Sequence, residues 1–225
     1  LYSFLKNLKE EGIQLYLNCT ITGLGKRVVG KTRSGQDLVL EPKAPTTKQS
    51  ISSLPDVIEL LGKAERIRLR IDPIVRIIDG EGNEFSSLKN VKVILEKIKD
   101  MGIKDISFSF LQEGVHNKVD RRFKKLGIQI KAPNKSERQK AAKWFKGLEE
   151  EYNVRISACC VEGFPETRCI DGELLESLHD SDQSIDLSEP RKREKCGCTK
   201  SIDIGGWPPK KCYTGCQYCY ANSSY

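Results

Sequence analysis

The sequence lacks the apolar segments that mark exported or membrane-bound chains. It contains no run of about eighteen apolar residues, the length that a membrane-spanning helix needs, and no charged start followed by an apolar stretch. A hydrophobic content of 38% is nevertheless enough to bury a core. We therefore expect a folded cytoplasmic protein with no membrane partner.

Methionine and histidine are also scarce. Met101 is the only methionine and the chain begins at Leu1, which indicates a fragment or a processed form of a longer protein. His116 and His179 are the only histidines, and we expect both to be surface residues rather than ligands.

The net charge of +7 comes partly from two short basic clusters. One consists of Arg121, Arg122, Lys124 and Lys125, and the other spans residues 191–193. Acidic residues interrupt or flank both clusters, which favours an ordinary solvated surface. A surface for nucleic acid or another polyanion is the alternative.

Helical and strand-like patterns alternate over residues 1–180. Strands are predicted at 13–21, 67–71, 104–110 and 154–159, and the second of them is expected to end at Asp72-Pro73. Helices are predicted at 2–11, 55–61, 88–98, 119–125 and 136–152, with a short one after Asp171. Ser136 and Gln139 have the spacing of a capping box for the helix at 136–152. Residues 26–52 show no steady period and are predicted to form a long loop with a hairpin.

This alternation predicts parallel strands joined by crossover helices, so the expected fold class is α/β. Each strand has one polar side, which favours a (β/α) barrel whose lumen binds a ligand. Four strands cannot close such a barrel. We therefore expect a partial or permuted (β/α) barrel at 1–180 with N-terminal strands missing, a charged linker at 181–195 and a cysteine-rich metal-binding tail at 196–225. An α+β sandwich with one hydrated sheet face is the alternative.

Cysteine, by contrast, is abundant, with nine residues of which five lie between Cys196 and Cys219. The spacings within Cys212, Cys216 and Cys219 allow one tight loop to place three thiolates on a [4Fe-4S] cluster and leave its fourth iron open. A zinc site made by Cys196, Cys198 and two of the later three is one alternative, and plain redox thiols are another.

Four cysteines outside the triplet are candidates for a second metal site. Cys196 and Cys198 precede the triplet, whereas Cys159 and Cys169 lie at and just after the last predicted strand. Four thiolates are enough to hold a second cluster or a zinc ion.

The Cys-x3-Cys-x2-Cys spacing, with Tyr218 directly before the third cysteine, resembles the signature of radical S-adenosylmethionine enzymes. The wider chain resembles an uncharacterised microbial family, a domain of unknown function related to spore photoproduct lyase. The segments that carry this resemblance are 20–23, 70–74 (Arg-Ile-Asp-Pro-Ile), 106–108, 157–159, 169–175 (Cys-Ile-Asp-Gly-Glu-Leu-Leu) and 196–222. Two departures from the wider superfamily are the position of the triplet at the end of the chain and the lack of a Gly-Gly-Glu segment on the second strand.

The resemblance implies an enzyme that uses a [4Fe-4S] cluster and S-adenosylmethionine to generate a 5'-deoxyadenosyl radical. Its electron donor would be a protein such as a ferredoxin or flavodoxin, and nucleic acid is one candidate for its unknown substrate. The candidate catalytic residues are Arg70 and Asp72, at the carboxyl end of a strand, and the candidate cofactor-binding residues are Tyr218, Arg70 and Ser107. The other hypothesis is a non-catalytic zinc or iron-sulfur module that stabilises a basic nucleic-acid-binding protein.

Overall fold

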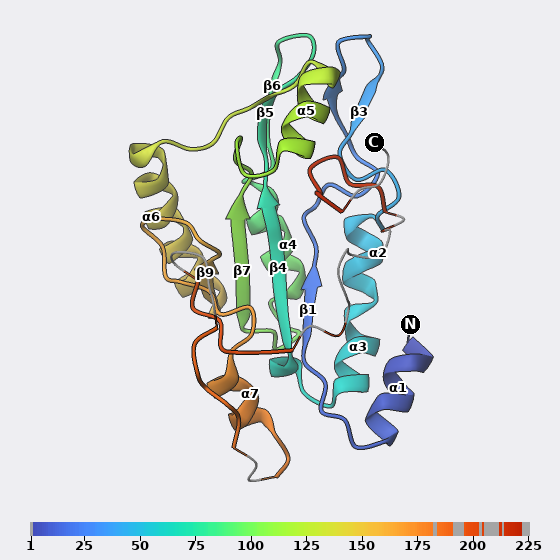
Figure 1. Ribbon diagram of the computed structural model, residues 1–225, viewed down its shortest axis with the longest axis vertical. Helices are drawn as coiled ribbons and strands as arrows, with labels where there is room; N and C mark the ends of the chain where they lie inside the picture. The colour runs from blue at the N-terminus through green and yellow to red at the C-terminus, as the bar shows by residue number, and fades with distance from the viewer. Residues whose placement is uncertain are drawn as a thin grey trace.

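The centre of the fold is a parallel sheet of four strands. The computed structural model describes residues 2–181, 184–190, 196–202, 204, 212 and 214–221, so the predicted linker and tail lie partly outside it. The strand order is β1-β4-β7-β9, with β1 at Leu17–Thr20, β4 at Ile67–Ile74, β7 at Asp105–Phe110 and β9 at Arg155–Ala158. Helices connect these strands (Figure 1). The predicted α/β class is confirmed, and the described residues form no closed barrel.

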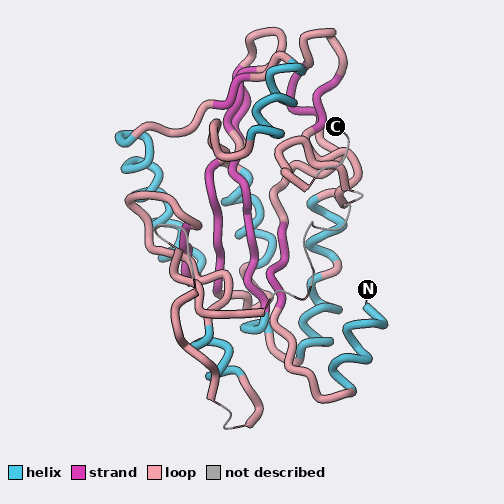
Figure 2. Tube along the Cα trace, in the orientation of Figure 1, coloured by secondary structure: helices cyan, strands magenta, loops and turns pink. Residues whose placement is uncertain are grey.

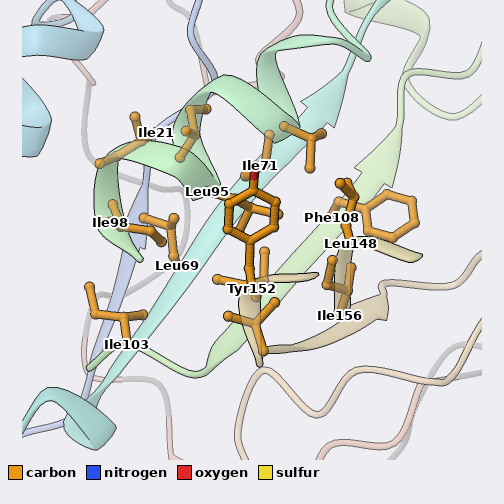
Figure 3. Packing of buried hydrophobic residues seen from close by; sticks show 14 of the residues in the cluster. Ile21, Leu69, Ile71, Leu95, Ile98, Ile103, Phe108, Leu148, Tyr152 and Ile156 are labelled. Carbon is orange, nitrogen blue, oxygen red and sulfur yellow. The ribbon is translucent and has the colours of Figure 1, made fainter. Parts of the chain in front are cut away.

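Helices cover the apolar face of this sheet. They are α2 (Thr47–Ser52), α3 (Leu54–Leu61), α4 (Asn90–Ile98) and α6 (Lys135–Tyr152). Leu69 and Ile71 of β4 belong to the same buried cluster as Leu95 of α4 (Figure 3). Phe108 of β7 stacks on Phe145 of α6 with 4.4 Å between ring centroids. Helix α1 (Tyr2–Glu10) buries no residue and lies at the edge of this layer.

The other face of the sheet is polar. Strand pairing aligns two rows of side chains, Asn18, Arg68, Asp105 and Arg155 in one and Thr20, Arg70, Ser107 and Ser157 in the next. Loops that follow β9, together with α7 (Gly172–Leu178), cover part of this face (Figure 2). Asn18 Nδ2, for example, donates to the carbonyl of Cys169 at 3.2 Å, and Arg66 donates to the carbonyl of Leu178 at 2.6 Å.

A smaller layer lies beyond the carboxyl ends of β4 and β7 (Figure 1). It contains the hairpin of β2 (Val28–Lys31) and β3 (Asp37–Val39), the antiparallel sheet of β6 (Glu84–Ser86), β5 (Arg76–Ile78) and β8 (Gln129–Ile130), and helix α5 (Asn117–Leu126). Leu24, Leu40, Ile77 and Phe123 contribute to a second core in this layer. The strands here are two to four residues long, too short to show a period in the sequence.

Several predicted boundaries in the first half of the chain were wrong. The first strand, predicted at 13–21, is only Leu17–Thr20. Residues 26–52 contain the predicted hairpin but also α2, which Thr46 and Gln49 stabilise with a capping box. Strand β4 does not end at Asp72-Pro73 but continues to Ile74. A register shift against β7 between Ile71 and Ile74 explains this, because it removes the proline from the regular ladder.

The predicted start of the long helix α6 was also wrong. Asn134 is its N-cap and forms the capping box with Glu137, so Ser136 and Gln139 are ordinary helical residues. The spacing of the true pair is the same, but an asparagine cap opens the helix two residues earlier. None of the helices in the described ranges is long and apolar enough to cross a membrane.

Candidate metal centre

The loop that carries the cysteine triplet is held next to the carboxyl end of β1. The hydroxyl of Tyr218 donates to the carboxylate of Glu41, and the same oxygen accepts a hydrogen bond from Thr22, two residues after β1. Glu41 is only 6% exposed. Tyr218 also packs against the second core, and burial raises the pKa of its hydroxyl well above the ordinary value. Tyr218 therefore connects the triplet to the sheet edge.

Main-chain contacts fix the same loop. The amide of Gln217 donates to the carbonyl of Leu40 at 2.8 Å, and the amide of Lys43 donates to the carbonyl of Thr214 at 3.3 Å. The guanidinium of Arg122 on α5 donates to the carbonyls of Gln217 and Cys219, the latter at 3.1 Å. A charged donor that bonds two carbonyls is a strong restraint on backbone position.

Thr214 contacts the first two thiols of the triplet. Thr214 Oγ1 lies 2.9 Å from Cys212 Sγ and 3.6 Å from Cys216 Sγ, and the amide of Cys219 donates to the carbonyl of Cys216. Gly215 has a φ of +66°, in the left-handed region that favours glycine, and this lets the loop turn between the first two thiols. Burial raises the pKa of the Cys216 thiol. The hydrogen bond with Thr214 opposes that rise, and Glu41, Cys219 and Cys212 add to it.

The donor chemistry of the triplet fits an iron-sulfur cluster. Three soft thiolates on one turn leave one corner of a cube without a protein ligand. A bound cationic metal would also stabilise the thiolate form of Cys216, which burial and Glu41 now disfavour. Within the described part of the chain, no three His, Cys, Asp or Glu side chains are spaced to share a single metal ion. A [4Fe-4S] cluster does not require its ligands to meet at a single ion, because each thiolate binds a different iron.

The predicted catalytic pair lies at the carboxyl end of the same sheet. Arg70 and Asp72 of β4 form a close ion pair, and the hydroxyl of Ser109 on β7 donates to the same carboxylate. Burial disfavours the charged form of Arg70, but Asp72 outweighs it and raises the pKa of the guanidinium above its ordinary value. Ser107 lies deeper and is 2% exposed, and its hydroxyl has no hydrogen-bond partner among the described residues. Arg70 and Asp72 keep 33% and 16% of their side chains exposed, whereas Ser107 is covered.

The four remaining candidate ligands lie near β9, the edge strand on the opposite side of the sheet from β1. Cys159 follows β9 directly, and Cys169, Cys196 and Cys198 lie in loops that cover the polar face. The thiols of Cys159 and Cys169 share a hydrogen bond, which lowers the pKa of Cys169 to about 6, with burial opposing the shift and Arg70 and Arg68 adding to it. The structure therefore separates the triplet from the other candidates and brings those four into one region.

Two residues that hold the triplet loop were not predicted as functional. Arg122 was assigned to a basic surface cluster, yet it is 1% exposed and contacts the tail, so neither surface interpretation applies to it. Its position on the apolar side of α5, next to Val119 and Phe123, is a signal that the sequence does contain. Glu41 lies in an irregular segment and has no such signal. Residues 191–193, the other basic cluster, lie outside the described residues.

Comparison with protein families gives a match over most of the chain. The family described as a domain of unknown function (DUF1848) matches residues 1–221, which is nearly the whole chain. Neither the curated proteins nor the solved structures contain a match to this chain.

Proposed function

The chain belongs to this family of unknown function, and we propose that it is an iron-sulfur enzyme of the radical S-adenosylmethionine type. In this proposal Cys212, Cys216 and Cys219 hold a [4Fe-4S] cluster and leave one iron open for the cofactor. When bound and reduced by a ferredoxin or flavodoxin, the cluster supplies the electron that splits the cofactor into methionine and a 5'-deoxyadenosyl radical. The four-stranded sheet would then be part of a larger (β/α) barrel.

The position of the triplet loop supports the proposal. The contacts from Tyr218 through Glu41 to Thr22 hold the loop at the carboxyl end of β1. In parallel α/β folds, ligands bind at this edge of the sheet. Arg70 and Asp72 lie at the same edge on the neighbouring strand.

Arg70 and Asp72 can bind the polar groups of S-adenosylmethionine. The Arg70 guanidinium can bind a carboxylate, and Asp72 can accept hydrogen bonds from an ammonium group or a ribose hydroxyl. Ser109 orients Asp72 by donating to one of its oxygens, which leaves the other oxygen for Arg70. Tyr218 is committed to Glu41, so its role in this proposal is to hold the loop rather than to contact the cofactor directly.

Anaerobic reconstitution tests the proposal. With dithionite and S-adenosylmethionine, we expect 5'-deoxyadenosine from the native chain and none from Cys216→Ala. The matched control is Cys19→Ala, which removes a half-buried thiol on the helix-covered face and should keep the activity. Normal 5'-deoxyadenosine formation by Cys216→Ala would refute the radical assignment.

A basic surface on α6 favours the nucleic-acid alternative as a second candidate. A cavity of about 660 Å³ is lined by residues that include Lys135, Arg138, Lys140 and Lys143. Arg138 is paired with Glu162 at 3.2 Å, so the exposed lysines carry the free positive charge of this cavity. If the surface binds nucleic acid, Lys140→Glu combined with Lys143→Glu should weaken DNA binding and reduce its salt dependence by about two phosphate contacts. Equal binding by this variant and the native chain would exclude α6 as the contact surface.

A further inference from the structure

A cavity of about 370 Å³ lies at the amino ends of β1 and β4, whereas the triplet loop lies at the carboxyl end of β1. Tyr16, directly before β1, and Arg66, directly before β4, line the cavity together with residues of α7 and of the segment after α7. We propose that this cavity binds a small organic carboxylate with an apolar body. The inference does not depend on the function proposed for the triplet.

The walls of the cavity are mostly apolar. The aliphatic residues that line it are Leu15, Leu175, Leu178 and Ile185, and Tyr16 adds an aromatic residue. Apolar walls with a few polar groups are usual for small-molecule sites, whose volumes are about 300–1,000 Å³. The body of the ligand is therefore expected to be hydrophobic.

Hydrogen bonds join the walls of the cavity directly. Arg66 donates from Nη2 to the carbonyl of Leu178 at 2.6 Å and from Nη1 to the carbonyl of Leu15 at 3.5 Å, the second being a weak bond. The amide of Ile185 donates to the carboxylate of Glu176 on α7 at 3.1 Å. Because these contacts fix the walls, little conformational entropy is lost when a ligand binds.

Arg66 gives the cavity a positive charge that is only partly compensated. It is 6% exposed, and its ion-pair partner among the described residues is Asp180 at 3.1 Å. The Asp180 side chain is 64% exposed, so water competes for its carboxylate and weakens the pair. A ligand carboxylate inside the cavity can replace Asp180 and accept a charge-assisted hydrogen bond where less water competes.

A second buried arginine, Arg68, lies against Tyr16. It is 4% exposed, its guanidinium carbon is 5.9 Å from the centre of the Tyr16 ring, and its Nε and Nη1 atoms have no hydrogen-bond partner among the described residues. Asp105, its neighbour in register, uses both carboxylate oxygens for Arg155 at 2.9 and 3.0 Å. The carboxylate of Asp171 is 3.9 Å from Nη2, too far for a hydrogen bond. A buried guanidinium with so few partners favours a negative charge nearby, so Arg68 adds to the positive potential beside the cavity.

The walls and the two arginines together select one class of ligand. Inorganic phosphate would supply the negative charge but would not cover the apolar walls. A neutral apolar molecule would cover the walls but would leave the charge of the arginines as it is. A carboxylate with an apolar body does both, with its head at Arg66 and its body against Leu175 and Leu178. Arg70 and Asp72 lie farther along β4, so this cavity is separate from the site proposed for S-adenosylmethionine.

Isothermal titration calorimetry of the native chain tests the site with probes that differ in one property. Phenylacetate and 4-methylpentanoate are the carboxylates with apolar bodies, 2-phenylethanol is the neutral comparison, and inorganic phosphate is the anion without an apolar body. At least one carboxylate should bind at least tenfold more tightly than 2-phenylethanol and phosphate. No binding by either carboxylate, or equally tight binding of a comparison probe, would overturn the proposal. The Cys216→Ala chain should give the same affinities, so failure of the radical proposal cannot produce or abolish this result.

Two variants decide whether the carboxylate binds in this cavity. Leu178→Trp fills the cavity and should weaken binding at least tenfold, whereas Asp180→Asn removes the competing charge at Arg66 and should tighten binding at least threefold. The matched control is Asp37→Asn, which removes an exposed carboxylate paired with Lys31 in the small layer and should leave the affinity unchanged. Circular dichroism checks that the variants are folded, and if Leu178→Trp does not fold, Asp180→Asn alone decides. Native affinity in a folded Leu178→Trp chain, or no tightening in Asp180→Asn relative to Asp37→Asn, would overturn the assignment of the cavity.

Discussion

Arg122 illustrates how one buried side chain can position a metal-binding loop. Its cation is almost fully removed from water and donates to the carbonyls of Gln217 and Cys219, the residues on either side of Tyr218. A long charged side chain can lie on the buried side of a helix when its charge has strong acceptors. The arginine thus connects α5 to the tail.

We predict that Arg122→Met loosens the tail and lowers stability by about 1.5–3 kcal/mol, because the variant removes charged hydrogen bonds and leaves two carbonyls without their donor. Urea unfolding measures the stability, and hydrogen exchange of peptide 214–221 measures the loosening. Arg121→Met is the matched control, since Arg121 is an exposed neighbour on the same helix. Equal exchange in the two variants would contradict the role of Arg122.

For single residues, the sequence predicted the type of metal ligand better than it predicted which residues contact each other. The spacing of Cys212, Cys216 and Cys219 indicated a metal site because ligand type and loop length are local properties. The partner of Tyr218 is 177 residues away, and no local pattern relates Glu41 to it. Long-range pairs of this kind depend on the complete fold, so they became visible only in the structure.

Helix α6 shows which signals define the ends of an element. Asn134 and Glu137 bond each other's main-chain amides at 3.0 and 2.8 Å, and Glu137 also pairs with Arg76 of β5. Ser136 has the residue type of a cap but lies inside the first turn. Periodicity located the helix correctly, and only the choice between two adjacent capping patterns failed.

We predict that Asn134→Ala destabilises the protein by about 1 kcal/mol, since it removes the acceptor for a free amide at the start of α6. Ser136→Ala, which changes the residue that the sequence pattern favours, should change stability by less than about 0.5 kcal/mol. Chemical denaturation of both variants measures the difference. A larger effect of Ser136→Ala would mean that the helix begins where the sequence pattern indicated.

Asp79 connects two elements of the small layer. Its carboxylate accepts hydrogen bonds from the amides of Lys31 on β2 at 2.8 Å and of Glu81 and Asn83 in the β5–β6 turn at 3.0 and 2.8 Å. The bond from Lys31 is the largest of the effects that lower the pKa of Asp79, and burial opposes it. The carboxylate form is therefore the one that stabilises the layer.

We predict that the stability difference between the native chain and Asp79→Asn depends on pH. A lowered pKa in the folded state means that the contribution is complete above the unfolded value of about 3.9 and is lost as the pH falls through the folded value. The difference should thus be constant from about pH 7 to pH 5 and shrink below about pH 4. Urea unfolding at these pH values measures it, and a difference that grows in acid would refute the role of the carboxylate.

The whole molecule contains two hydrophobic cores, and the smaller one contacts the triplet loop. The large core lies between the sheet and helices α2, α3, α4 and α6, and the small core lies under the hairpin, the antiparallel sheet and α5. The large core was predictable because its helices and strands have clear periods. The small core was not, since its strands are short, yet it is the one that Tyr218 of the triplet loop contacts.

We therefore expect mutations in the two cores to have different effects on the triplet loop. Leu40 of the small core and Leu95 of the large core are both 0% exposed, and replacing either by alanine should cost about 2–5 kcal/mol. Leu40 also contacts the loop through its carbonyl, which accepts the amide of Gln217. Leu40→Ala should increase hydrogen exchange of peptide 214–221 more than its loss of global stability explains, because it disturbs the surface that holds the loop.

Leu95→Ala is the control for this comparison. Hydrogen exchange of peptide 214–221 in this variant should rise only as much as its loss of global stability explains. Helix α4, which carries Leu95, makes no described hydrogen bond to the triplet loop. Comparing the two variants at urea concentrations that give equal global stability separates the local effect from the global one. If both variants then exchange at the same rate, the small core does not support the loop specifically. The hydrogen bonds of the loop to Glu41, Arg122 and the main chain of Leu40 and Lys43 would then hold it at the sheet edge.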